Sequence, residues 1–342
     1  MRSHTPISRR TLLAQSLRMA ASSAAVPALL RLPIAAAQSA LPATGTHLVL
    51  LGTQSGPNFS PERSESANAV VVDGVPYIVD LGEGGLMSLR RSGLNYRNVS
   101  RVFLTHLHDD HSADVASFLS HQWTDGRTAP TVVAGPYGTE QLVVAALDVA
   151  RANAAIRLAD EARSVQPRDI FRGEDLAATT EPHEVYRDAR VTVSSIENTH
   201  FPEESKRRFP YRSLSYRFDT PTRSIVFSGD TAYSSGVVRL ARGADVFVCE
   251  AIEVARMRQA FDQRVANGAY ADNPEGIWKH IVETHSTTAD AGRMAAEAEV
   301  GLLVLSHLAP GALQPLNDEE YVRGVREHFA GQVVVGKDLM VL

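Results

Sequence analysis

The residues best suited to chemistry form a dense run at about one third of the chain. Three histidines and two aspartates follow one another in Thr105-His106-Leu107-His108-Asp109-Asp110-His111. In an extended segment, residues two positions apart point to the same side, so His106 and His108 can share one ion. The chain then turns, and Asp110 and His111 begin a predicted helix. This density of imidazole and carboxylate groups after an apolar strand favours metal binding over a purely structural role.

Four further candidates come after strand-like segments or just before a helix: His200, Asp230, His285 and His307. Taken singly, each could be structural. Together they supply the imidazoles and the bridging carboxylate that a centre of two metal ions needs, with one histidine to spare. The single cysteine, Cys249, excludes an internal disulfide and a thiolate-rich metal site. Histidine and carboxylate side chains must therefore hold any metal.

Short β-branched runs alternate with helical patterns and position these residues. The predicted strands are 47–51, 69–72, 77–80, 101–105, 131–134, 191–196, 213–218, 224–227, 246–249, 302–305 and 332–335. The predicted helices are 85–91, 110–123, 139–158, 236–242, 254–265, 288–298 and 318–329. Each half of the mature chain begins with hairpin-like pairs of strands, and helices follow them. This order favours two packed β-rich sheets with helices outside. The polar stretch 159–186 is predicted to be a surface insertion.

Several motifs together resemble the metallo-β-lactamase superfamily from about residue 45 to residue 342. They are Leu51-Gly52-Thr53, Asp80-Leu81-Gly82, the histidine-rich run, His200, Ser228-Gly229-Asp230 and His307, in the family's order. Glu250-Ala251 and His285-Ser286-Thr287 further resemble the branch with ribonuclease Z and the metallo-β-lactamase-type arylsulfatases. The resemblance implies an α/β fold, an αββα sandwich of two packed mixed β-sheets with outer helices.

The resemblance also implies two zinc ions per chain, with other divalent metals left open. It assigns His106, His108 and His200 to one ion, Asp110, His111 and His307 to the other, and Asp230 to both. Water held between the ions would lose its proton near neutral pH and attack the substrate. As a ligand of one of these ions, Asp110 is also predicted to be a catalytic residue.

Further roles follow from the same branch. His285, assisted by Glu250, would help the leaving group depart as a general acid. Asp80 would orient a metal ligand, although capping a turn is the alternative. Arg208 and Arg212, in the basic segment 202–212, are candidate contacts for the anionic oxygens of a substrate, with a solvated surface as the alternative. Two departures from the branch are Cys249, where relatives often have histidine, and the lack of a glycine-rich basic arm that clamps tRNA.

The first 37 residues have the features of an export signal. They contain Ser8-Arg9-Arg10-Thr11-Leu12-Leu13, a twin-arginine pattern, and end in Ala35-Ala36-Ala37, a small-residue cleavage site. The apolar stretch 19–30 is too short to span a bilayer, so no stable membrane span is expected. We therefore expect residues 1–37 to engage the twin-arginine machinery, and residues 38–342 to act in the periplasm as a single hydrolase domain. The sequence leaves open whether this domain forms a homodimer.

Charge narrows the choice of substrate. The full chain has a net charge of −5, and without residues 1–37 it has 29 basic against 39 acidic side chains, a net of −10. A chain with this net charge binds a polyanion poorly, so nucleic acid is not expected as a partner. The favoured substrate is a small anionic ester, an aryl sulfate or a phosphodiester. The alternatives are a tRNA 3′-end endonuclease like ribonuclease Z, a lactonase or β-lactamase, and a non-catalytic periplasmic zinc-binding protein.

Overall fold

Two mixed β-sheets form the centre of the molecule. The computed structural model describes residues 41–56, 60–311 and 317–342. The first sheet contains β1 (Thr46–Gly52), β2 (Ala67–Val72), β3 (Val75–Leu81), β4 (Arg101–Phe103), β5 (Thr131–Gly135) and β6 (Phe171–Asp175). The second contains β7 (His183–Arg187), β8 (Thr192–Glu197), β9 (Leu214–Asp219), β10 (Ser224–Phe227), β11 (Val246–Ile252), β12 (Leu302–Ala309) and β13 (Gln332–Val335). Each sheet is antiparallel at one end, β1 to β3 and β7 to β10, and parallel over the remaining strands.

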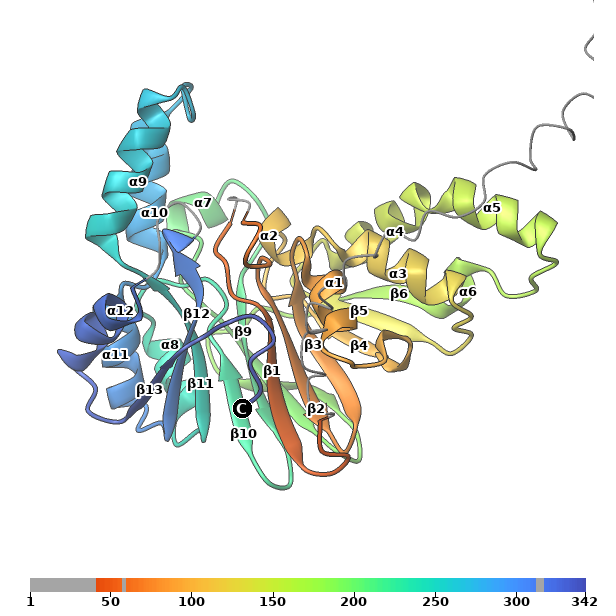
Figure 1. The fold of residues 1–342 in the computed structure, drawn as a ribbon, viewed down its shortest axis with the longest axis horizontal. Coiled ribbons are helices and arrows are strands. Elements are labelled where there is room, and N and C mark those ends of the chain that lie inside the picture. Colours follow the sequence, from red (N-terminus) through yellow and green to blue (C-terminus); the bar gives the residue numbers. More distant parts are fainter. Residues whose placement is uncertain (1–40, 57–59, 312–316) are drawn as a thin grey trace, which may run out of the picture. The chain divides into compact units, whose positions relative to one another are not determined.

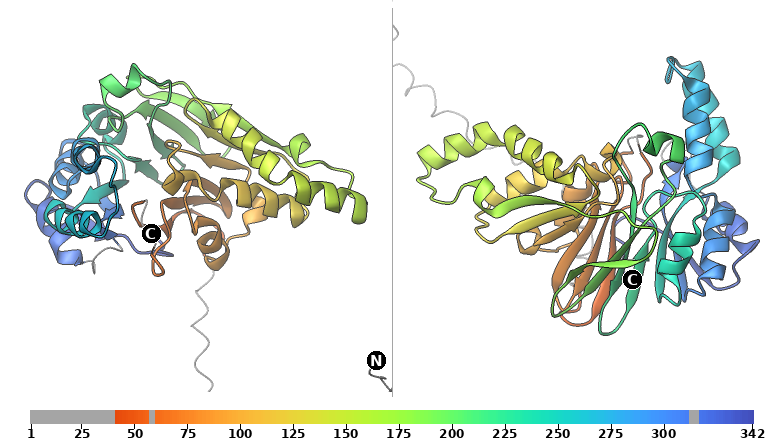
Figure 2. Two further views of the ribbon diagram at one scale, coloured as in Figure 1. Left: turned by 90° about the horizontal axis from the view of Figure 1, so that it is seen from above. Right: turned by 180° about the vertical axis from the view of Figure 1, so that it is seen from behind.

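Helices cover the outer face of each sheet (Figures 1 and 2). The first half contains α1 (Gly85–Arg91), η1 (Tyr96–Asn98), α2 (Asp109–Ser112), α3 (Val115–Thr124), α4 (Thr139–Val149), α5 (Arg151–Asp160) and α6 (Pro167–Ile170). The second contains α7 (Glu203–Lys206), α8 (Ser235–Ala241), α9 (Val254–Ala266), α10 (Pro274–Thr284), α11 (Thr288–Glu297) and α12 (Asp318–Arg326). Helices α1, α3 and α4 pack on the first sheet, and α8, α11 and α12 on the second. The αββα sandwich is therefore confirmed.

A third apolar core lies between the two sheets and holds them together. Phe103 of β4 meets Phe218 of β9 edge to face, with ring centroids 5.4 Å apart. Leu48 of the first sheet and Val248 of the second belong to the same cluster and are buried. Burial of such surfaces is worth about 25 cal/mol per Å². This packing fixes the strand ends of one sheet against those of the other.

The prediction for residues 159–186 is wrong, because this stretch contributes an edge strand to each sheet. Strands β6 and β7 are largely polar, and apart from the buried Phe171 their residues are partly buried or exposed. They therefore lack the apolar runs that mark the central strands. The predicted helix 139–158 is two helices, α4 and α5, and α10 was not predicted at all. Helices α9 and α10 form a hairpin that projects from the sandwich (Figure 1).

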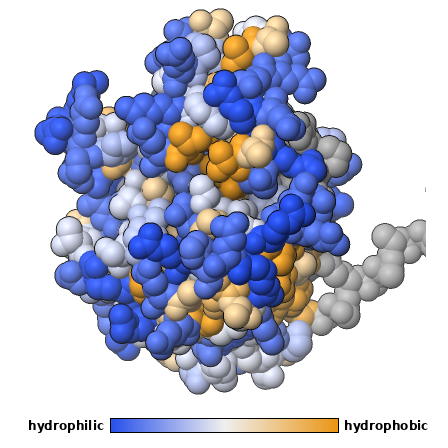
Figure 3. Space-filling view, turned by 90° about the vertical axis from the view of Figure 1, so that its left-hand side faces the viewer, coloured by the Kyte–Doolittle hydropathy of each residue, from blue (hydrophilic) through white to orange (hydrophobic). Residues whose placement is uncertain are grey.

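The predicted export segment, residues 1–37, lies outside the described residues. Within the described ranges, no helix combines the length and the apolar character needed to cross a membrane. On the face shown in Figure 3, hydrophilic side chains predominate and apolar ones form separate small areas.

Candidate metal centre

The candidate residues gather at one edge of the sandwich, where strands of both sheets end. Asp80 lies near the end of β3, His106 follows β4, and Asp230 follows β10. His307 lies within β12 at a register shift, where Glu250 pairs with Ser306 but the next residue pairs with Leu308. This bulge and a positive φ of 44° at His307 redirect its side chain toward the centre. Asp80, with φ of 60°, shares this uncommon backbone conformation.

Three histidines form the first ligand group. His106 Nε2 lies 3.0 Å from His108 Nδ1, and His200 Nε2 lies 3.3 Å from the same atom. His200 Nδ1 donates a hydrogen bond to the Thr284 carbonyl at 3.2 Å, which leaves Nε2 with its lone pair. Burial lowers the pKa of both His106 and His200, so that both imidazoles are neutral, as metal ligands must be.

The second ligand group combines imidazoles with carboxylates. His307 Nε2 lies 3.1 Å from Asp110 Oδ2, and His111 Nε2 lies 3.2 Å from Asp230 Oδ1. Burial lowers the pKa of His111, but the Asp230 and Asp110 carboxylates outweigh it and hold that pKa well above its usual range. His111 Nε2 and Asp230 Oδ1 are buried without a hydrogen-bond partner. A cation between them would satisfy both atoms.

Asp230 links the two groups. Its Oδ1 faces His111 and lies 3.4 Å from His307 Nε2, whereas its Oδ2 lies 3.8 Å from His106 Nε2. One carboxylate thus presents one oxygen to each group. The complete set of histidines and carboxylates matches the donors that zinc takes in catalytic sites.

The surroundings of the second group hold its ligands in place. Asp80 Oδ2 accepts a hydrogen bond from His111 Nδ1 at 2.9 Å, and Asp80 Oδ1 accepts one from the Thr105 amide at 2.7 Å. Asp110 Oδ2 accepts a hydrogen bond from the Gly56 amide at 2.8 Å. A Cβ at Gly82 would lie 2.0 Å from the Asp110 carbonyl oxygen, so only glycine fits there.

His285 lies beside both groups and pairs with a buried carboxylate. Its Nδ1 is 2.7 Å from Glu250 Oε2 and 3.7 Å from Asp230 Oδ2. The side chain of His285 is 13% exposed, whereas that of Glu250 is 1% exposed. Burial lowers the pKa of His285, but the Glu250 charge and hydrogen bond outweigh it and raise that pKa. A protonated imidazole at the mouth of a metal centre has the position and charge of a proton donor.

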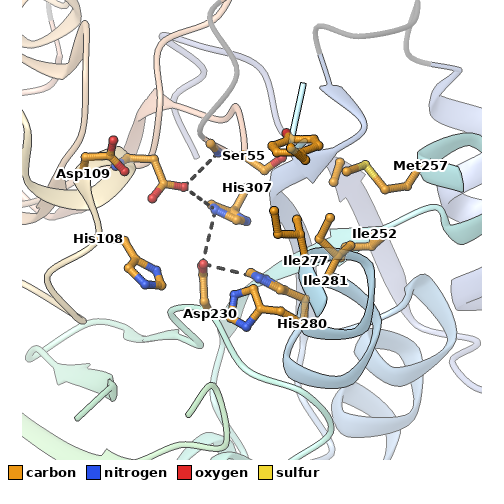
Figure 4. Close-up of a pocket in the computed structure, with 15 residues that line it drawn as sticks. Ser55, His108, Asp109, Asp230, Ile252, Met257, Ile277, His280, Ile281 and His307 are labelled. Atoms are coloured by element: carbon orange, nitrogen blue, oxygen red, sulfur yellow. Dashed lines mark hydrogen bonds and ion pairs between the residues drawn. The ribbon is translucent and has the colours of Figure 1, made fainter. Parts of the chain in front are cut away.

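A cavity of about 320 Å³ opens over these residues (Figure 4). One wall is polar and carries His108, Asp109 and Asp230. The opposite wall is apolar and comes mainly from the α9–α10 hairpin and the end of β11. The centre therefore faces a space of the size of a small ligand.

Arg208 and Arg212 do not reach this cavity. Arg208 is 74% exposed and pairs with Glu204, and Arg212 Nε lies 3.6 Å from Glu197. Neither arginine lines the cavity. Acidic neighbours pair with these side chains: Arg208 does so on the surface, whereas Arg212 is 27% exposed.

His280 was missed by the sequence analysis, which left it as a structural or surface residue. It lines the cavity, with its ring centroid 5.4 Å from that of His200 and 5.5 Å from that of His285. The spacing of Ile277, His280 and Ile281 fits one helical face and was the available signal. Cys249, in contrast, is fully buried, and burial raises the pKa of its thiol, as expected for an inert side chain.

Comparison with known proteins agrees with this geometry. Residues 69–308 match a family described as "Beta-lactamase superfamily domain". Ribonuclease Z of Mycobacterium bovis (strain BCG / Pasteur 1173P2) is 30% identical over 295 residues, which cover 85% of this chain and 96% of the relative.

Two solved structures share the fold. The short form of human tRNase Z has a TM-score of 0.61 at 20% identity, covering 86% of this chain and 98% of the other. The metallo-β-lactamase fold protein YhfI from Bacillus subtilis has a TM-score of 0.59 at 17% identity, covering 87% and 98%. With most of its length matched by the family and by ribonuclease Z, the chain belongs to the β-lactamase superfamily, in the branch that contains ribonuclease Z, and is a metal-dependent hydrolase.

Proposed function

We propose that this hydrolase cleaves small phosphodiesters with two zinc ions bound at the two ligand groups. The position of Asp230 carries the proposal, because its two oxygens face separate sets of ligands. His106, His108 and His200 would hold one ion, and Asp110, His111 and His307 the other. When bound, zinc would supply a hydroxide near neutral pH and neutralise the charge of the ester oxygens.

The chain's own residues would orient the substrate and handle the proton. Asp80 fixes the ring of His111, and the Gly56 amide fixes the Asp110 carboxylate. His285, held by Glu250, would give its proton to the departing alcohol oxygen. The buried Glu250 carboxylate keeps the His285 ring in one orientation, which lowers the entropic cost of reaching a productive geometry.

The substrate is proposed to be small because of the walls of the cavity. Among the residues that line it in the described part of the chain, none is lysine or arginine. A polynucleotide needs many cationic contacts to its phosphates, whereas a single diester needs only the metal ions. An aryl sulfate carries the same single negative charge and is the second small ester to test. We favour the diester because the relatives are ribonucleases.

Precursor-tRNA processing is a second candidate, and one observation favours it specifically. The ribonuclease Z of M. bovis is matched over 96% of its length, so the likeness is not confined to the metal ligands. If the chain processes tRNA, its RNA-binding surface must lie outside the cavity.

Assays of three substrates with one protein preparation distinguish these activities. The zinc-loaded protein is assayed with bis(4-nitrophenyl) phosphate, 4-nitrophenyl sulfate and a precursor tRNA at the same enzyme concentration. We expect measurable turnover of the diester, which Asp230→Ala abolishes, and little cleavage of the precursor. Efficient precursor cleavage without diester turnover would establish the second candidate instead.

A further inference from the structure

The apolar wall of the cavity is a continuous cluster of apolar side chains from several elements. Ile252, Met257 and Ala309 form a small buried cluster, against which Trp278 and Ile281 pack. Met257 and Ile281 come from α9 and α10, Ile252 ends β11 and Ala309 ends β12. Four elements thus converge on one apolar surface, three of them consecutive in sequence and the fourth, β12, more distant.

This wall belongs to the same elements as the proposed proton donor. Helix α10 carries Ile277 and Ile281 one turn apart on the cavity side, and His285 is the residue at which the helix ends. In β11, Ile252 follows Glu250 by two residues, and its amide donates a hydrogen bond to the Ser286 carbonyl at 2.8 Å. The wall and the His285–Glu250 pair are therefore rigidly connected.

The candidate metal ligands lie on the side of the cavity opposite the apolar wall. Figure 4 shows Asp109 and His108 on one side of the space, with Ile252, Ile277 and Met257 on the other. A phosphoryl group at the metal ligands would direct its leaving oxygen toward His285. The rest of the leaving group would then lie along the apolar wall.

We propose that this wall selects the leaving group, so that the preferred diester releases an alcohol or phenol with a bulky apolar body. The proposal rests on the proposed diester hydrolysis and adds Ile277 and Ile281 as specificity-determining residues. Contact between apolar surfaces in a cavity favours the larger group by about fourfold in kcat/KM for each buried methylene. A polar leaving group such as a sugar would gain nothing there.

The test compares leaving groups of nearly equal acidity. Phenyl methyl phosphate and 4-ethylphenyl methyl phosphate differ by two carbons on the leaving side. We expect kcat/KM to favour the ethyl compound by about fifteenfold in the wild type. Ile281→Ala should bring this ratio close to one, because the methylenes that contact the ethyl group are removed. Since both substrates are measured on one preparation, a partly unfolded variant leaves the ratio unchanged.

Val282→Ala is the matched control, because Val282 is the next residue of α10, is branched like Ile281 and does not line the cavity. Its ratio should stay at the wild-type value. A second pair, methyl and benzyl 4-nitrophenyl phosphate, places the apolar group on the retained side, where Ile281→Ala should leave the ratio unchanged. Two results would overturn the inference while diester hydrolysis stands. One is a wild-type ratio near one for the phenyl and ethylphenyl pair. The other is that Ile281→Ala changes the ratio only for the methyl and benzyl pair. If no diester is hydrolysed, the proposed function fails and this inference with it.

Discussion

Replacing His285 by alanine would remove the cavity-lining imidazole that lies closer to Glu250, since His307 Nδ1 lies 3.5 Å from the same carboxylate oxygen. His285 Nδ1 is engaged by Glu250 at 2.7 Å, which leaves Nε2 as the ring nitrogen available to a substrate. If this nitrogen protonates the leaving oxygen, its loss should matter only when that oxygen needs a proton. His285→Ala should therefore slow diesters of phenol and alkyl alcohols far more than diesters of 4-nitrophenol.

The expected magnitude follows from the environment of the ring. Lost general-acid catalysis costs roughly 10²–10⁴ in rate. The side chain of His285 is 13% exposed and borders an open cavity, so water can partly take its place. We expect a loss of about 10²–10³ in kcat for a phenyl ester, equal to about 3–4 kcal/mol of transition-state stabilisation. For a nitrophenyl ester, which leaves as a stable anion, the loss should stay below about tenfold.

The assay measures kcat for both ester types at equal zinc content, determined by metal analysis. His280→Ala is the control, because His280 also lines the cavity but bonds through Nδ1 to Thr284 and not to a carboxylate. Its losses should be similar for the two esters. Equal losses for the two esters in His285→Ala would refute the acid role and leave His285 as a binding residue.

Three further predictions concern the metal, the core and export. Asp230→Ala should lose metal from both ligand groups, measured as zinc per chain after dialysis, and retention of two ions would contradict the bridging role. Phe103→Ala should lower the free energy of unfolding by about 3–5 kcal/mol in denaturant titration, because it opens a cavity beside Phe218 between the sheets. Replacing Arg9 and Arg10 by lysine should retain the protein in the cytoplasm, seen by cell fractionation, because the twin-arginine signal is read by a receptor; unchanged periplasmic yield would count against it.

Local sequence carried most of the information about the metal ligands. His106, His108, Asp110 and His111 lie within six residues, so strand and helix geometry alone brings them together. Gly229 before Asp230 likewise indicated a turn at a strand end. The fold followed from central strands whose apolar runs are plain because both faces are buried. These features depend on neighbours in sequence, which is why they could be predicted.

The cavity could not be predicted in this way. Its apolar wall joins Ile252, Met257, Ile281 and Ala309, which come together only after two neighbouring strands of the second sheet and the α9–α10 hairpin have packed. The edge strands β6 and β7 carry mixed polar sequences, and most of their residues are partly buried or exposed, so they lack a strand-like apolar pattern.

The centre exists only when both sheets have docked, and this bears on how the metal is acquired. His106 and His108 follow a strand of the first sheet, whereas His200 follows a strand of the second sheet and His307 lies in another. A bound ion would therefore join the sheets and stabilise the folded chain by RT ln(1 + [metal]/Kd), about 2.7 kcal/mol at a hundredfold excess over Kd. An unfolded chain does not hold these ligands together, so the complete centre forms only as the chain folds. The twin-arginine route carries folded proteins, so a chain exported by it could be loaded before it leaves the cytoplasm.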